Sequence, residues 1–245
     1  MRRMRRMPQK IMFSLLKNKK TLFIIICLFF LSCVKTTRDE ESQSAWYISA
    51  EKYIEADKII IDHSIDQKES FTEDFNARSK AKNDLLNATK PTDSELEVLL
   101  QSNNLKKVKI GLVTIMIKKI YSEKLFNMIP HLYSEYEDYW LRFYSIECFK
   151  IIDDMTLKQY EDKFLDMILK ENNGSLLITC MPLIIRFDES KQVSFFVNYM
   201  INGNPELQNA LGVYLCRTTS QCIEKVREQI LLKNANALLK YLECN

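Results

Sequence analysis

The chain has 245 residues, with 35 Lys and Arg against 32 Asp and Glu, and its net charge of +3 is unevenly distributed. Residues 1–32 hold eight basic side chains and no acidic one, which leaves residues 33–245 with a net charge of −5. This balance argues against a basic nucleic-acid-binding body. With only four Gly and five Pro, the chain also lacks the residues that tight-turn β folds and glycine-rich phosphate loops require.

An apolar run at residues 21–32 follows the basic N-terminus. Its length suits a secretory signal of about 7–15 residues and is short for a membrane-spanning helix of about 20. The next residues, Phe30-Leu31-Ser32-Cys33, resemble the lipobox of bacterial lipoprotein signal peptides. The resemblance implies cleavage of residues 1–32, a diacylglycerol group on Cys33, and a place in the bacterial envelope, on the outer membrane facing the periplasm or the surface. An ordinary secretion signal and an uncleaved signal anchor are the alternatives.

A polar segment at residues 33–44 has the composition of a flexible tether. Residues 45–90 then predict a helical hairpin. Apolar side chains recur there at helical spacing, first at Trp46, Ala50, Tyr53, Ile54, Ile60 and Ile61, and then at Phe71, Phe75, Leu85 and Leu86.

A break at residues 87–93 separates this hairpin from a helical-repeat domain at residues 91–245, and Thr92 begins a run of N-cap residues. Four apolar segments follow, beginning at residues 106, 139, 176 and 205. Each is apolar on most sides and predicts a helix buried on most sides. One-sided amphipathic helices are expected between them, near residues 125–133, 157–168 and 193–200, with Pro130 kinking or shortening the first.

The alternation of buried and amphipathic helices at steps of 29 to 37 residues indicates an all-α repeat architecture. It resembles HEAT-type repeats, and the resemblance implies antiparallel helix pairs stacked as a short α-solenoid. An irregular helical bundle gives much the same pattern and is the alternative.

The cysteines matter because an envelope compartment is oxidising. Five lie beyond Cys33, at positions 148, 180, 216, 222 and 244. Cys216 and Cys222 flank a short turn between two expected helices, so we predict a disulfide between them. Cys148 and Cys180 lie in successive buried helices and are expected to be free thiols.

Recognisable catalytic chemistry is sparse. The chain has two histidines, His63 and His131, which are far apart in sequence, and it has no zinc-ligand spacing and no Gly-x-Ser-x-Gly motif. Residues 49–52 match Ser-x-x-Lys, a four-residue pattern that arises by chance and that we expect on an exposed helix. We therefore predict no catalytic residue, no metal site and no small-molecule cofactor.

An aromatic stretch interleaved with charges is the one surface cue for binding. Aromatic and Arg side chains are enriched at interface hot spots, and the candidates are Tyr133, Tyr136, Glu137, Asp138, Tyr139, Trp140 and Arg142. Their acidic neighbours suit a basic protein partner. The alternative is that most of these rings fill the core between repeats.

Taken together, these patterns predict an exported, lipid-anchored helical-repeat protein that binds another protein at the envelope, as a scaffold or adaptor or as an immunity-type lipoprotein. One alternative is an envelope hydrolase acting on peptidoglycan, glycan or lipid. The other is a signal-anchored membrane protein with the same helical body. Nucleic acid is not an expected partner.

Overall fold

The computed structural model describes residues 44–63, 70–216 and 220–243. The chain divides into two units, Met1–Ser44 and Ala45–Asn245, and all described helices belong to the second. Cys33 and the signal-like segment lie outside the described residues. Within the described ranges every regular element is a helix, so the predicted all-α class is confirmed.

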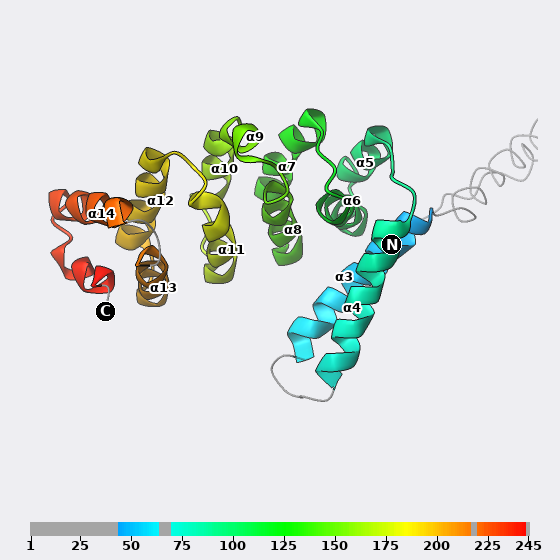
Figure 1. Cartoon of the computed structure of the whole chain (residues 1–245), viewed down its shortest axis with the longest axis horizontal. Coiled ribbons are helices and arrows are strands. Elements are labelled where there is room, and N and C mark those ends of the chain that lie inside the picture. The colour runs from blue at the N-terminus through cyan, green and yellow to red at the C-terminus, as the bar shows by residue number, and fades with distance from the viewer. Residues whose placement is uncertain (1–43, 64–69, 217–219, 244–245) are drawn as a thin grey trace, which may run out of the picture. The chain divides into compact units, whose positions relative to one another are not determined.

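Helices from residue 93 onward form successive pairs (Figure 1). The described residues form five pairs in chain order: α5 (Asp93–Leu100) with α6 (Leu105–Lys118), α7 (Glu123–Glu135) with α8 (Tyr139–Phe149), α9 (Asp154–Lys158) and α10 (Glu161–Ile168) with α11 (Gly174–Ile184), α12 (Glu189–Asn202) with α13 (Pro205–Leu215), and α14 (Ser220–Leu232) with the 3₁₀ helix η1 (Asn236–Leu242).

The pairs stack into two layers. In one layer, which we call the inner layer, α6 contacts α8, α8 contacts α11, α11 contacts α13, and α13 contacts η1. In the outer layer, α5 contacts α7, α7 contacts α10, and α12 contacts α14. This arrangement, in which each pair touches its neighbours in the chain, is that of a short α-solenoid.

The α-helices of the inner layer were predicted from their apolar density, and the structure confirms that these segments are helical; η1 was not predicted. The apolar segments at residues 106, 139, 176 and 205 correspond to α6, α8, α11 and α13, which begin at Leu105, Tyr139, Gly174 and Pro205. α6 and α8 are buried on most sides because neighbours of both layers cover them, whereas α11 and α13 keep an exposed face that includes Ile178 and Val213. Pro130 lies inside α7, and the helix continues past it to Glu135.

Short polar side chains set where several helices begin. Thr92 forms a capping box with Glu95: the Glu95 N–H donates to Thr92 Oγ1, and the Thr92 N–H donates to Glu95 Oε2 at 2.7 Å. This satisfies backbone donors that the first helical turn cannot pair. Side-chain oxygens cap five further helices, at Asn104, Asp138, Asp153, Asn173 and Asn204.

The predicted N-terminal hairpin consists of α3 (Ala45–His63) and α4 (Ser70–Asn87), which pack against each other. Trp46, Ala50, Tyr53 and Ile54 are all buried, as the helical spacing indicated. Both helices also contact α6. The hairpin is therefore packed on the first helix pair of the repeats.

A buried carboxylate joins the hairpin to the stack. Asp57 of α3 is 5% exposed and accepts a hydrogen bond of 3.0 Å from the hydroxyl of Tyr144 in α8. Arg78 of α4 forms an ion pair with the same carboxylate and donates to the Tyr53 hydroxyl at 2.7 Å. Burial raises the pKa of Asp57, and the hydrogen-bonded Arg78 and Tyr144 oppose that shift.

At the other end of the stack, η1 approaches α13 closely. A Cβ on Gly212 would lie 1.9 Å from the carbonyl oxygen of Tyr241, so only glycine permits this packing of the 3₁₀ helix. Among the described helices, none combines the length and apolar character that crossing a membrane requires.

Candidate functional site: a groove between α12 and α14

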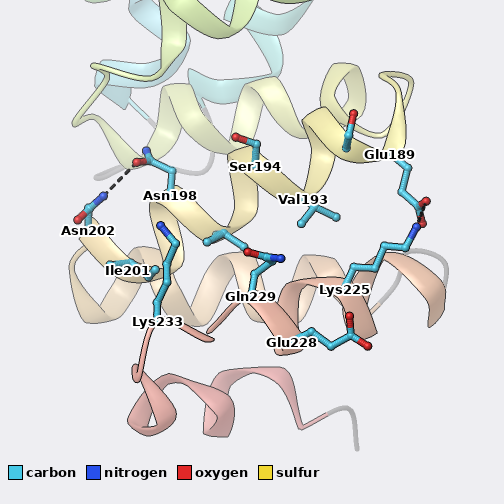
Figure 2. A pocket seen from close by; sticks show the side chains of 12 residues that line it. Glu189, Val193, Ser194, Asn198, Ile201, Asn202, Lys225, Glu228, Gln229 and Lys233 are labelled. Carbon is cyan, nitrogen blue, oxygen red and sulfur yellow. Dashed lines mark hydrogen bonds and ion pairs between the residues drawn. The ribbon is translucent and has the colours of Figure 1, made fainter. Parts of the chain in front are cut away.

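A groove of about 800 Å³ runs between two neighbouring outer-layer helices, α12 and α14 (Figure 2). Its apolar floor is formed by Val193, Val197 and Ile201, which follow one another at four-residue steps along α12. That spacing places them on one face of the helix.

Polar side chains form the two walls. On α12 they also recur at four-residue steps, at Ser190, Ser194, Asn198 and Asn202. On α14 and directly after it, the facing wall consists of Lys225, Glu228, Gln229 and Lys233. Two helices therefore present parallel rows of hydrogen-bonding groups on either side of an apolar strip.

The two ends of the groove differ in charge. At one end, Lys225 forms an ion pair with Glu189 at the start of α12. At the other end, Lys233 extends toward the Asn198–Ile201 region of α12 (Figure 2) and has no ion-pair partner among the described residues. The Lys225 charge is therefore compensated within the described part of the chain, whereas the Lys233 charge has no such compensation there.

Most of the amide and hydroxyl groups in the walls also lack partners within the described chain. The Asn202 Nδ2 donates to Asn198 Oδ1 at 3.0 Å, which leaves the Asn198 Nδ2 and the Asn202 Oδ1 available. The side chains of Gln229, Ser190 and Ser194 make no hydrogen bond to any described residue. The groove thus offers both donors and acceptors to a ligand.

Sequence reasoning did not find this groove, although part of its signal was present. The apolar side of residues 193–200 predicted an amphipathic helix, and the polar residues Ser190, Ser194, Asn198 and Asn202 recur beside it with a period of four residues. The facing wall belongs to a helix more than twenty residues further along the chain, and only the contact between α12 and α14 brings the two rows together.

The predicted aromatic stretch lies mostly inside the protein. Tyr133 is 3% exposed, and Tyr136, Tyr139 and Trp140 are partly buried against the core, whereas Glu137 is exposed. These rings therefore serve packing between helix pairs, which is the alternative that the sequence left open.

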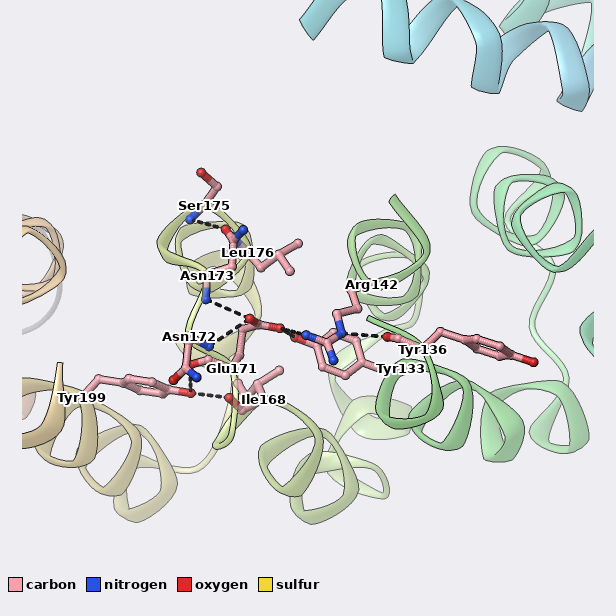
Figure 3. A network of polar contacts seen from close by, with 10 residues as sticks. All are labelled: Tyr133, Tyr136, Arg142, Ile168, Glu171, Asn172, Asn173, Ser175, Leu176 and Tyr199. Carbon is pink, nitrogen blue, oxygen red and sulfur yellow. Dashed lines mark hydrogen bonds and ion pairs between the residues drawn. The ribbon is translucent and has the colours of Figure 1, made fainter. Parts of the chain in front are cut away.

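Two members of that stretch, Tyr133 and Arg142, converge on Glu171 in the loop before α11 (Figure 3). The Tyr133 hydroxyl and the Arg142 Nη1 donate to Glu171 Oε2 at 2.5 and 3.2 Å. The backbone N–H groups of Asn172 and Asn173 donate to Oε1 at 2.9 and 2.8 Å. Glu171 is 4% exposed.

The neighbouring pair also contacts this loop. Tyr199 of α12 donates hydrogen bonds to the carbonyl oxygens of Ile168 and Glu171. Burial raises the pKa of the Tyr133 hydroxyl, and the hydrogen bond to the Glu171 carboxylate raises it further. The carboxylate of Glu171, the guanidinium of Arg142 and the two tyrosine hydroxyls all have partners within the chain. We therefore interpret this cluster as a link between helix pairs and not as an open binding site.

Asp138 is likewise engaged internally. Its Oδ1 caps α8 by accepting from the Leu141 N–H at 2.8 Å, and its Oδ2 pairs with Lys109 of α6 at 3.0 Å. Burial acts to raise the pKa of Asp138, but the hydrogen bonds from Leu141 and Lys109 outweigh it, so the pKa is lowered.

The predicted disulfide between Cys216 and Cys222 is wrong. Cys216 is disulfide-bonded, but Cys222 is a free thiol, 1% exposed in the apolar core beside Ile223 and Val226. The partner of Cys216 is not among the cysteines that the structure describes. Cys148 and Cys180 are buried free thiols, as expected, and burial raises the pKa of both.

His131 lies on α7 with a side chain that is 79% exposed, 3.9 Å from Glu135, and it is not part of the groove. The side chain of His63 lies outside the described residues. Within the described ranges, no group of three or more His, Cys, Asp or Glu side chains is arranged to hold a metal ion.

The chain matches no protein-family model, and no curated protein or solved structure is significantly similar to it.

Proposed function

We propose that this chain is an exported, lipid-anchored protein that binds another protein at the bacterial envelope through its stack of helix pairs. The observation that carries the proposal is the groove between α12 and α14, where an apolar floor is flanked by polar walls that keep several hydrogen-bonding groups without a partner among the described residues. Concave apolar surface rimmed by polar groups commonly marks a binding site on a protein. A scaffold or adaptor in an envelope complex and an immunity-type lipoprotein that captures a toxin both fit this role.

The inner layer supplies a second indication. Ile178 of α11, Ile185 at its end and Val213 of α13 are 53%, 45% and 49% exposed. Stacked repeats offer extended surfaces for partners, and apolar side chains left exposed on neighbouring helices favour such a use.

The anchoring part of the proposal rests on Ser32-Cys33 after the apolar run at residues 21–32. Its test is the intact mass of the protein extracted from membranes, compared with a Cys33→Ser variant. We expect the mass of residues 33–245 plus a diacylglycerol group, and loss of that species in the variant. The mass of the full unmodified chain would refute lipidation.

The binding part is tested by placing a photo-crosslinking amino acid at Asn198 in the groove and, as the control, at Asp166, an exposed position on α10. We expect one discrete crosslinked protein from intact cells at position 198 and none at position 166. Absence of any adduct at 198, or the same adducts at both positions, would refute the groove as the binding site.

A further inference from the structure

We propose that the groove between α12 and α14 binds a segment of the partner protein in extended conformation, about five to six residues long, with a carboxylate side chain beside Lys233. This inference rests on the proposed protein-binding function and adds to it the chemical class of the ligand. The spacing of the walls, the apolar floor and the distribution of charge each contribute to it.

The spacing of the α12 wall suits an extended chain. Residues four apart on a helix are separated by about 6 Å along its axis, and in an extended chain the groups facing one side recur about every 6.6–6.8 Å. Ser190, Ser194, Asn198 and Asn202 can therefore meet the backbone groups of every second residue of one segment along most of α12. From Ser190 to Asn202 the helix rises about 18 Å, which corresponds to five or six extended residues.

The chemistry of the walls favours an extended segment over a helix. An amide side chain such as Asn198 or Gln229 has both a donor and an acceptor, the same groups that a peptide bond offers. A bound helix has already paired its backbone groups and would leave these side chains unused, whereas an extended segment brings unpaired N–H and C=O groups into the groove.

The floor accommodates alternate side chains. In an extended segment, every second side chain points to the same side. Those that point down would contact Val193, Val197 and Ile201, while the others would remain in solvent. We therefore expect apolar residues at alternate positions of the ligand.

The charge distribution sets where an acidic residue belongs. Lys225 is already paired with Glu189, and Glu228 on the same wall repels a second carboxylate there. Lys233 has no ion-pair partner among the described residues and lines the same groove as Asn198 and Asn202 (Figure 2). A carboxylate placed there gains a charge-assisted hydrogen bond.

The test uses the full-length chain in detergent and fluorescent hexapeptide pools, acetylated and amidated at their ends. The pools have Val, Ile or Leu at alternate positions, Ser or Asn between them, and Asp, Asn or Lys at one end. A further Asp pool carries N-methyl groups on alternate peptide bonds. Fluorescence anisotropy measures binding of each pool.

We expect the Asp pool to bind about tenfold or more tightly than the Lys pool, and N-methylation to weaken binding by a similar factor. Lys233→Met should abolish the preference for Asp. Lys170→Met, which removes an exposed lysine outside the groove, should leave it unchanged. Unaltered thermal unfolding by circular dichroism shows that each variant is folded.

Several results would overturn the inference. They are equal binding of the Asp and Lys pools, indifference to N-methylation, and absence of binding by every pool. Self-association of the chain that disappears in Asn198→Arg would show instead that the groove is filled by a second copy. The crosslink at position 198 reports separately on the proposed function: if it persists while every pool fails, a partner binds there through a folded surface.

Discussion

Replacement of the buried Glu171 by glutamine should destabilise the stack of helix pairs. Glu171 accepts hydrogen bonds from Tyr133 of α7, from Arg142 of α8 and from the two backbone N–H groups that follow it. It therefore links the α7–α8 pair to the loop that leads into α11.

The magnitude follows from what an amide can replace. Glutamine has a single oxygen, so it can keep the two backbone donors or the Tyr133 and Arg142 donors, but not all four. Breaking a buried ion pair costs about 3–5 kcal/mol. Because the Arg142 side chain is 23% exposed and can recover some hydration, we expect the lower end, about 3 kcal/mol. A domain with a total stability of about 5–15 kcal/mol loses an appreciable fraction of it.

Urea unfolding of the full chain, followed by circular dichroism, measures this loss as a change in the free energy of unfolding. The matched control is Glu137→Gln at the α7–α8 turn, where the side chain is exposed and has no partner among the described residues. It should change stability by less than about 0.5 kcal/mol. If the two variants were equally stable, the Glu171 cluster would not hold the pairs together.

Three further changes follow from the structure. The native pKa of Asp138 is lowered, so its ionised form stabilises the fold above the unfolded pKa of about 3.9, and this contribution is lost as pH falls through the native pKa. Asp138→Asn keeps the cap and removes the Lys109 ion pair. In urea unfolding it should lower the free energy of unfolding by about 1.5 kcal/mol at pH 7 and by less at pH 3. Gly212→Ala should displace η1 through a clash with Tyr241 and cost about 1–3 kcal/mol, with faster proteolysis of the C-terminal segment. Cys216→Ser should release its disulfide partner and add one reactive thiol to the unfolded, unreduced chain.

An equal cost of Asp138→Asn at both pH values would contradict a lowered native pKa. Gly174→Ala adds a Cβ that meets nothing within 4 Å and should be neutral or slightly stabilising. If it lowered the free energy of unfolding as much as Gly212→Ala, the clash with Tyr241 would not be the cause of the Gly212 effect. Cys222→Ser should lower the number of reactive thiols by one. If the number rose by one instead, Cys216 would have been bridged to Cys222 and the predicted disulfide would be correct.

Sequence patterns alone determined the helices of the repeats, because helix formation is encoded locally. The apolar segments predicted the first residues of α6, α8, α11 and α13 to within two residues, and Thr92 before Glu95 predicted the start of α5. Caps and apolar periodicity each act over a few turns of one helix, so they are visible in a window of about 15 residues.

Only the tertiary structure decided which side chains meet. The aromatic stretch has the composition of an interface, yet Tyr133 and Arg142 point to a glutamate about thirty to forty residues away. Cys216 and Cys222 are close in sequence, but Cys222 is packed in the core, so proximity along the chain predicted the wrong bridge. The groove needs α12 and α14 side by side, and each helix alone has an ordinary amphipathic pattern. Such contacts depend on how whole helices stack, and no local window of the sequence contains that information.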